Sequence, residues 1–252
     1  MIRLGTRGSL LAMAQAQLVA DRLAGAEIVP ITTAGDRDRS SRFDAIGDGR
    51  GVFTREIERA LAAGRIDAAV HSAKDLTGDM ADGLVIAAML ERDDPRDAVC
   101  GPFAALAAIP DGARVGTSSV RRSGLLAELR PGLHVVPLRG NVDTRLRKLD
   151  SGDADAIVVA AAGLRRLGLE SRIGFVLDPR VFVPEAGQGA IAVQVRRGEE
   201  HLVAALDHAP TREAVEAERA CVQRLGGGCS VPVAAHAWHQ DGRLQLRQWV
   251  GR

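Results

Sequence analysis

Arginine and hydroxyl side chains gather where predicted strands give way to helices. In GTSSVRRSGLLAEL, helix-capping positions are held by Thr117, Ser118 and Ser119, and the first helical turn contains Arg121 and Arg122. Cations there oppose the positive end of the helix macrodipole, so an anionic ligand would relieve the conflict. Backbone N–H groups, hydroxyls and guanidinium forks would together bind a carboxylate or phosphate. The alternative is two exposed arginines that tolerate a cost of about a few tenths of a kcal/mol.

The same arrangement recurs in two further segments. LRGNVDTRL places Arg139 at a strand end, Asn141 at an N-cap position and Arg145 in the next turn. GTRGSLLA places Arg7 just before a helix that begins near Ser9. Open α/β sheets bind ligands at the carboxyl ends of their strands, where all three segments fall. The repetition predicts a ligand with several separated anionic groups.

A candidate acid–base group closes the apolar run IDAAV. In HSAKDL, His71, Lys74 and Asp75 emerge together at a predicted strand end. A proton-transfer group beside a cation would there face the ligand that the arginines hold. The alternative is that Asp75 only caps the turn that follows.

The three cysteines have to be explained one by one, because they show no CxxC spacing and cannot all pair. Neither a disulfide framework nor a metal site is therefore expected. LGGGCSVP puts Cys229 on a glycine-rich loop, which suits a covalent attachment point, although a buried structural thiol is an open alternative. Cys100 and Cys221 are interpreted as small buried hydrophobic residues.

The elements that carry these residues alternate in the manner of βαβ units, which predicts an α/β fold. Strands are predicted at 2–6, 27–33, 66–72, 84–90, 114–117, 134–138 and 155–160, and a further alternating strand follows GQGA within 187–200. Helices are predicted from Ser9 onward, around 53–61, around 125–129 and over 211–225, the last with Thr211 as a candidate N-cap. Two final strands should meet at Asp241–Gly242, and 91–100 and 187–200 are predicted crossing points between domains.

Composition narrows the classes of function. The 252 residues carry 33 Lys+Arg and 32 Asp+Glu, a net charge of +1, which disfavours a uniformly basic nucleic-acid binder. No apolar run approaches the roughly 20 residues of a membrane helix, and the start lacks a secretory signal, so we expect a cytoplasmic protein without a membrane partner. The cations comprise two lysines and 31 arginines. This bias reflects either many bidentate anion contacts or a drift in composition.

Taken in order, eight segments resemble the porphobilinogen deaminase family: TRGSLLA, HSAKDL, ERDDPRDA, VGTSSVRR, LRGNVDTRLRKLD, AAAGLRRLGLESRI, GQGA and GGGCSVP. The resemblance implies two lobes like those of type II periplasmic binding proteins and a small α+β C-terminal domain. We expect domain 1 at 1–92 and 187–208, domain 2 at 93–186 and domain 3 at 209–252. Family members continue past VGR, so domain 3 is expected to be truncated.

The resemblance also implies a transferase of porphyrin, tetrapyrrole and heme biosynthesis that acts as a monomer. It would condense four porphobilinogen molecules stepwise, with loss of ammonia, into hydroxymethylbilane. A dipyrromethane cofactor would be joined by a thioether to Cys229, with Asp75 as the catalytic residue. The family's substrate-binding positions match Arg7, Ser9 and Gln15, and its cofactor-binding positions match Lys74, Thr117, Ser118, Ser119, Arg121, Arg122, Arg139 and Arg145.

This chemistry agrees with the residue types. Each porphobilinogen carries an acetate and a propionate, so a growing chain presents many carboxylates for bidentate arginines. Asp75 would stabilise the cation that ammonia loss produces and then accept a ring proton. Two departures stand out: KDLTGD lacks the proline that usually follows the family's Lys-Asp pair, and Arg50 replaces a common lysine. The alternatives are an inactive or truncated homologue and a non-catalytic two-lobed anion-binding module.

Overall fold

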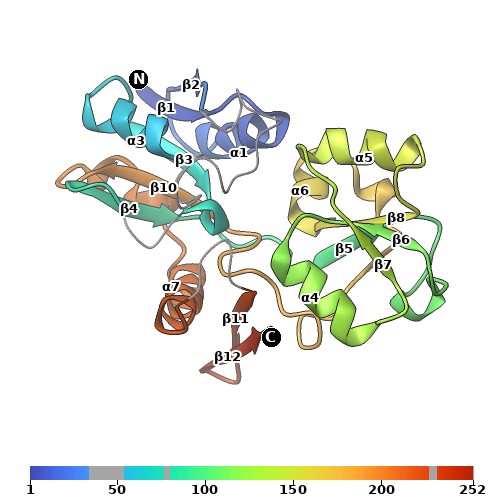
Figure 1. Cartoon of the computed structure of the whole chain (residues 1–252). Helices are drawn as coiled ribbons and strands as arrows, with labels where there is room; N and C mark the ends of the chain where they lie inside the picture. Colours follow the sequence, from blue (N-terminus) through green and yellow to red (C-terminus); the bar gives the residue numbers. More distant parts are fainter. Residues whose placement is uncertain (34–53, 77–79, 227–231, 252) are drawn as a thin grey trace. The chain divides into compact units, whose positions relative to one another are not determined.

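The computed structural model describes residues 1–33, 54–76, 80–226 and 232–251, which form two compact units (Figure 1). Unit 1 comprises Met1–Asp93 and Ala190–Arg219, and unit 2 comprises Asp94–Gly189 and Ala220–Arg252. Two of their three boundaries, after Asp93 and after Gly189, fall inside the segments 91–100 and 187–200 that were predicted to cross between domains, and the third, after Arg219, lies outside both. Cys229 and Arg50 lie outside the described residues. Within the described ranges, no helix combines the length and apolar character needed to cross a membrane.

Unit 1 is built on a five-stranded sheet. Its elements are β1 (Ile2–Arg7), α1 (Leu10–Ala20), β2 (Ala26–Ile31), α3 (Arg55–Ala62), β3 (Ala68–Ser72), the 3-10 turn η2 (Ala73–Asp75), β4 (Leu84–Met89), β10 (Ile191–Arg196), the 3-10 turns η5 (Glu200–Leu202) and η6 (Ala204–Leu206), and α7 (Ala209–Arg224), whose last residues group with unit 2. The strand order is β2-β1-β3-β10-β4. β1 runs parallel to β2 and β3, whereas β10 is antiparallel to both of its neighbours.

Strand alternation divides the core of unit 1 between the two faces of this sheet. Ala16 and Val19 of α1 pack with Leu4 and Val70 on one face. Ile57 and Leu61 of α3 pack with Ala69 in a second cluster, and Ala69 precedes Val70, so it points to the opposite face. α1 begins at the predicted place, where the Ser9 hydroxyl accepts from the Ala12 N–H at 3.3 Å.

Unit 2 repeats this plan. Its elements are β5 (Asp97–Cys100), η3 (Leu106–Ala108), β6 (Arg114–Gly116), α4 (Val120–Leu129), β7 (His134–Val136), α5 (Val142–Asp150), β8 (Ala156–Ala160), α6 (Ala161–Arg166), η4 (Glu170–Arg172), β9 (Phe175–Val176) and the hairpin β11 (Val233–Gln240) with β12 (Arg243–Val250). The strand order of its main sheet is β7-β6-β8-β5-β9. In both sheets the first three strands in the spatial order are parallel, and the fourth is antiparallel to the third. This fourth strand is β5 in unit 2 and β10 in unit 1, and each is the first strand after the chain crosses from the other unit.

The α/β fold class is confirmed, and the predicted strands appear with ends shifted by at most two residues. The hairpin turn is confirmed by the backbone: Asp241 and Gly242 have φ angles of 51° and 71°, which the Asp-Gly pair tolerates. Two expectations need correction. β5 was missed, because its charged approach resembles a linker. α7 begins at Ala209, and the Thr211 hydroxyl accepts from the Arg92 N–H at 3.0 Å inside the first turn.

The hairpin docks onto α4 through one tryptophan. The half-buried Trp249 indole donates to the Glu128 carboxylate at 2.7 Å. A Cβ on Gly124 would lie 2.6 Å from the far edge of the same ring, closer than van der Waals contact permits. The Trp249 ring therefore fits against α4 because Gly124 has no side chain.

We predict that Gly124→Leu displaces the hairpin. Leucine favours a helix over glycine by about 1 kcal/mol, so a net loss of stability would report the clash with Trp249. In a Trp238→Phe background, the fluorescence of Trp249 should shift to longer wavelength as the indole becomes solvated. Unchanged emission together with a raised melting temperature would contradict this docking.

Candidate active site

The carboxyl edge of the unit 1 sheet brings together several predicted residues. Arg7 ends β1, and Ser9 caps α1. Gln15 of α1 is buried, and its side-chain Nε2 donates to the Ser72 hydroxyl at the end of β3 at 2.9 Å. The sequence predicted that these residues lie at one edge of the sheet. It did not predict the hydrogen bond from Gln15 to the end of β3, the strand that leads into Lys74 and Asp75.

Lys74 and Asp75 lie on the short turn η2 directly after β3. The Asp75 side chain is exposed and that of Lys74 is half-buried. The turn is tied to the sheet because the Ala73 N–H donates to the Ala190 carbonyl at 3.0 Å. Inside the turn, the Leu76 N–H donates to the Ala73 carbonyl at 3.3 Å. The arrangement holds a carboxylate and an ammonium side by side at the edge of unit 1.

The prediction that His71 joins this edge is wrong. Its ring is 5% exposed, and its Nε2 lies 3.2 Å from the Gln194 Oε1. Gln194 in turn donates to the Glu58 carboxylate of α3 at 2.9 Å. Burial lowers the pKa of His71 to about 4, although the bond to Gln194 opposes this shift. Alternation along β3 turns the ring into the core, where it is neutral at pH 7.

In unit 2, the N-terminus of α4 has the predicted caps. The Ser119 hydroxyl accepts from the Arg122 N–H at 3.4 Å, and the Thr117 hydroxyl accepts from the Ser119 N–H at 3.2 Å. Ser118 is exposed between them. These bonds satisfy backbone donors of the first turn from within the chain.

The two arginines of that turn are buried rather than exposed, and they share one carboxylate. Arg121 Nη1 donates to Asp97 Oδ2 at 2.8 Å, and Arg122 Nε donates to Oδ1 at 2.9 Å. Gln188 Nε2 donates to Oδ1 at 3.2 Å, and Asp97 itself is 0% exposed. Burial alone would raise the pKa of Asp97, but Arg121 and Arg122 hold it well below its ordinary range. The carboxylate is therefore ionised at neutral pH.

Asp97 supplies the counter-charge that the sequence reasoning missed. The sequence suggested either that these arginines are exposed or that a ligand neutralises them. Neither explanation is sufficient, because the Asp97 carboxylate of β5 already neutralises part of their charge. An acidic residue that opens the apolar run DAVC was the available signal. A charge that starts a buried strand has to be paired.

Positive charge remains after this pairing. Arg121 Nε and Nη2, which form the side-on fork that binds carboxylates, are buried and have no hydrogen-bond partner among the described residues. The half-buried Arg145 donates to the Gly140 carbonyl at 2.7 Å, and among the described residues it meets no carboxylate. Burial and the charge of Arg122 lower the pKa of Arg145 to about 10. Asp97 thus pairs with Arg121 and Arg122, and Arg145 adds a further positive charge that interacts with Arg122.

The loop before α5 sets the position of Arg145. Gly140 has a φ of 120°, and a Cβ there would lie 2.7 Å from the Thr144 side chain. Asn141 stands at the predicted N-cap, but its side chain makes no capping bond. Arg139 is exposed on this loop, and its carbonyl accepts from the Lys148 ammonium at 3.2 Å. The predicted residues Arg139 and Arg145 therefore flank one glycine turn.

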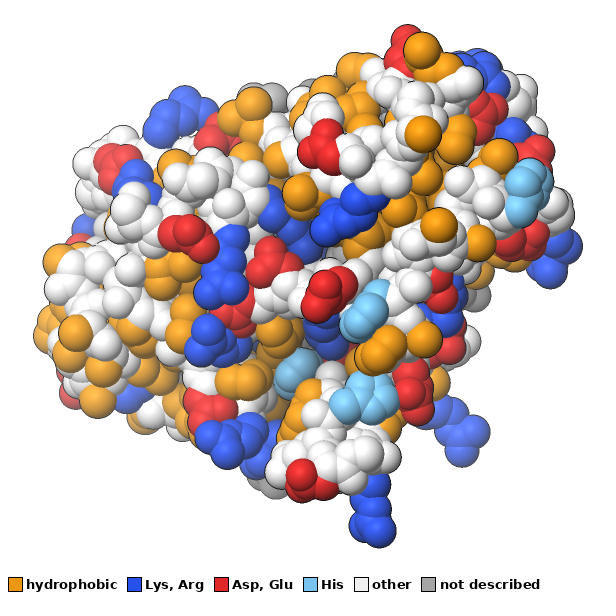
Figure 2. Space-filling view, turned by 180° about the vertical axis from the view of Figure 1, so that it is seen from behind, with side chains coloured by type: hydrophobic (Ala, Val, Ile, Leu, Met, Phe, Trp, Pro, Cys, Tyr) orange, Lys and Arg blue, Asp and Glu red, His pale blue; other side chains and the backbone are white. Residues whose placement is uncertain are grey.

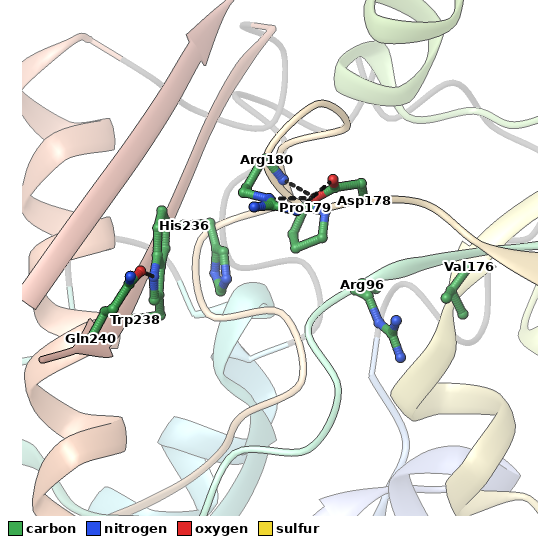
Figure 3. A pocket seen from close by; sticks show the side chains of 8 residues that line it. All are labelled: Arg96, Val176, Asp178, Pro179, Arg180, His236, Trp238 and Gln240. Carbon is green, nitrogen blue, oxygen red and sulfur yellow. Dashed lines mark hydrogen bonds and ion pairs between the residues drawn. The ribbon is translucent and has the colours of Figure 1, made fainter.

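A separate pocket of about 570 Å³ lies in unit 2 between the hairpin and the loop after β9 (Figure 3). Its lining consists of Arg96, Val176, Asp178, Pro179, Arg180, His236, Trp238 and Gln240, and it contains no predicted site residue. Arg96 pairs with Asp94 at 2.7 Å, and Arg180 pairs with Asp178 at 3.2 Å. Because its cations already have carboxylates, this pocket is not the predicted anion site.

The other cysteines do not compete with Cys229 for attachment chemistry. Cys100 is buried, and burial raises the pKa of its thiol to about 11. Cys221 is half-buried on α7, and its Sγ donates to Gln248 Oε1 at 3.0 Å. Among the described residues, no group of three or more His, Cys, Asp or Glu side chains could hold a metal ion.

Two α/β units of one sheet plan, with a Lys–Asp pair at one edge and an arginine-rich helix start at another, define a two-unit α/β protein. Basic and acidic side chains otherwise intermingle over the face shown in Figure 2, in keeping with the near-neutral charge. Comparison with known proteins makes the class specific. Residues 2–204 match the family model "Porphobilinogen deaminase, dipyromethane cofactor binding domain", and residues 212–252 match "Porphobilinogen deaminase, C-terminal domain".

Similar proteins carry the same name. A porphobilinogen deaminase of Roseiflexus sp. (strain RS-1) is 50% identical over 98% of this chain and 85% of its own length. One of Paraburkholderia phymatum is 48% identical over 97% of this chain and 77% of its own. Among solved structures, the methionine-binding protein MetQ matches with a TM-score of 0.48 and 15% identity over 81% of this chain and 89% of its own. The chain belongs to the porphobilinogen deaminase family.

We predict that Asp97→Asn destabilises unit 2 strongly. Removal of one partner from a buried ion cluster leaves uncompensated charge and costs about 3 to 5 kcal/mol. The matched control is Asp155→Asn, which breaks the surface pair with Arg114, where both side chains are more than 40% exposed, and should cost much less. Urea denaturation measures both. Equal losses would show that Asp97 is not the central counter-charge.

His71 predicts a pH dependence of stability. Its pKa of about 4 in the folded chain lies below the ordinary 6.5, so between these values the unfolded chain binds a proton that the folded chain does not. The free energy of unfolding should therefore fall as pH drops from about 6.5 to about 4, by up to about 3 kcal/mol. His71→Gln should flatten this slope in chemical denaturation at stepped pH. If the free energy of unfolding depends on pH equally in the parent protein and in His71→Gln, the lowered pKa of His71 is contradicted.

Proposed function

We propose that this chain catalyses the stepwise condensation of four porphobilinogen molecules, with loss of ammonia, to hydroxymethylbilane, a transferase reaction of porphyrin biosynthesis. Family membership over both matched segments supports the reaction class. The structural observation that carries the proposal is the surplus of guanidinium over carboxylate at the start of α4. A substrate whose every ring adds two carboxylates is the kind of ligand that such a surplus retains.

The residues of unit 2 fit the dipyrromethane cofactor that the family model names. Within the part of the chain that the structure describes, the Nε–Nη2 edge of Arg121 and the guanidinium of Arg145 meet no carboxylate, and a polycarboxylate would supply one. The groups proposed to hold it are Lys74, Thr117, Ser118, Ser119, Arg121, Arg122, Arg139 and Arg145, with a thioether to Cys229. When bound, the cofactor supplies the pyrrole carbon to which the first substrate is joined.

Asp75 is the proposed catalytic residue. Its exposed carboxylate can stabilise the positive charge that ammonia loss leaves on porphobilinogen, and it can then accept the proton released from the ring carbon. Arg7, Ser9 and Gln15 are proposed to bind the incoming substrate at the same edge of unit 1, where the Gln15–Ser72 bond fixes the amide.

We propose that the chain works as a cytoplasmic monomer with domains at 1–92 plus 187–208, 93–186 and 209–252. Family membership supports this organisation. The two compact units divide the last of these segments, because residues up to Arg219 group with unit 1 and those from Ala220 with unit 2.

Intact-mass measurement and turnover of two variants test the proposal. Cys229→Ser should lose the mass of a dipyrromethane adduct that the parent protein carries after incubation with porphobilinogen. Asp75→Asn should keep the adduct and lose most turnover, because the amide neither stabilises the cation nor accepts a proton. Near-normal product formation by Asp75→Asn would refute the catalytic assignment, and a parent protein that never gains the adduct would refute the function.

A further inference from the structure

One face of α7 packs against the turn that carries Lys74 and Asp75. Val215 is 0% exposed and shares a hydrophobic cluster with Ala73 and Leu76, the residues on either side of the Lys–Asp pair. Arg219 follows Val215 by one helical turn and so projects from the same face. All of these residues belong to unit 1.

Arg219 binds the backbone on both sides of that pair. Its Nη1 donates to the Leu76 carbonyl at 2.9 Å and to the Ala73 carbonyl at 3.4 Å. A single 3-10 turn has little internal bonding, so its terminal carbonyls depend on outside donors. The Arg219 guanidinium thus bridges the carbonyls of the two residues that flank Lys74 and Asp75.

The helix that presents Arg219 is itself fixed to the sheet at other points. Arg212 Nη2 donates to the Ala87 carbonyl of β4 at 2.9 Å. Glu218, which is 0% exposed, accepts from Arg92 at 2.6 Å. α7 is therefore also held by contacts away from the turn that Arg219 binds.

The environment of Arg219 favours this role over a surface ion pair. Its side chain is half-buried, and burial lowers its pKa, while Glu216 opposes the shift. A partly desolvated guanidinium needs acceptors, and the two carbonyls are acceptors that cannot move without the turn.

We propose that Arg219 is a positioning residue for the reaction: it clamps the carbonyls of Ala73 and Leu76 and so fixes the direction in which Asp75 presents its carboxylate. The inference rests on the proposed function for the role of Asp75, but the clamp itself is a property of the fold. Displacement of a reacting group by about 1 Å can cost up to about a hundredfold in rate.

The test compares Arg219→Met, Arg219→Lys and the matched control Arg212→Met, which removes an arginine-to-carbonyl contact from the same helix away from the turn. Hydrogen exchange of the Leu76 amide should speed up at least about tenfold in Arg219→Met and stay unchanged in Arg212→Met. With adduct-bearing protein, kcat of Arg219→Met should fall at least about tenfold with KM nearly constant. Arg219→Lys should recover part of both, because an ammonium donates without the fork.

Three outcomes decide the matter. Unchanged Leu76 exchange in Arg219→Met would overturn the clamp. Equal losses of kcat in Arg219→Met and Arg212→Met would also overturn it, because both would then act through docking of α7. A parent protein without turnover but with the expected exchange pattern would overturn the proposed function and uphold the clamp.

Discussion

Burial of the Asp97 carboxylate between two guanidinium groups is the interaction on which the arginine-rich edge of unit 2 depends. Arg121 and Arg122 occupy a helical turn where cations are disfavoured, and Asp97 makes that placement tolerable. The charges are not balanced, because a third guanidinium, that of Arg145, interacts with the positive charge of Arg122. A fold that needed only stability would match the charges, so the residual positive charge supports the proposal that this edge binds an anionic ligand.

Unit 1 carries an exposed carboxylate, that of Asp75, at the edge of its sheet. Asp75 stands on a turn of three residues that is bonded at Ala73 to Ala190, the residue before β10, and to α7 by Arg219. Behind it, a neutral His71 and its amide partner Gln194 fill the core without adding charge. The exposed carboxylate of Asp75 thus lies apart from the buried polar chain of His71, Gln194 and Glu58.

Local patterns allowed most of the architecture to be predicted. Alternating apolar runs gave the strands, Ser9 and Ser119 gave two helix starts, and Asp241–Gly242 gave the hairpin turn. Contacts between distant residues could not be predicted in this way. The Asp97–Arg121 and Arg219–Leu76 contacts join residues 24 and 143 positions apart, which no local spacing reveals. His71 was misplaced because a single step along a strand reverses the face of a side chain.

Reversible binding to the Cys229→Ser protein tests the central claim most directly, because it separates charge recognition from covalent attachment. Calorimetric titration would compare a dipyrromethane bearing free acetates and propionates with its methyl ester. The account predicts that the free acid binds at least about tenfold more tightly and that Arg145→Gln removes most of this difference. Equal affinity for acid and ester would contradict the claim that surplus guanidinium charge holds the ligand.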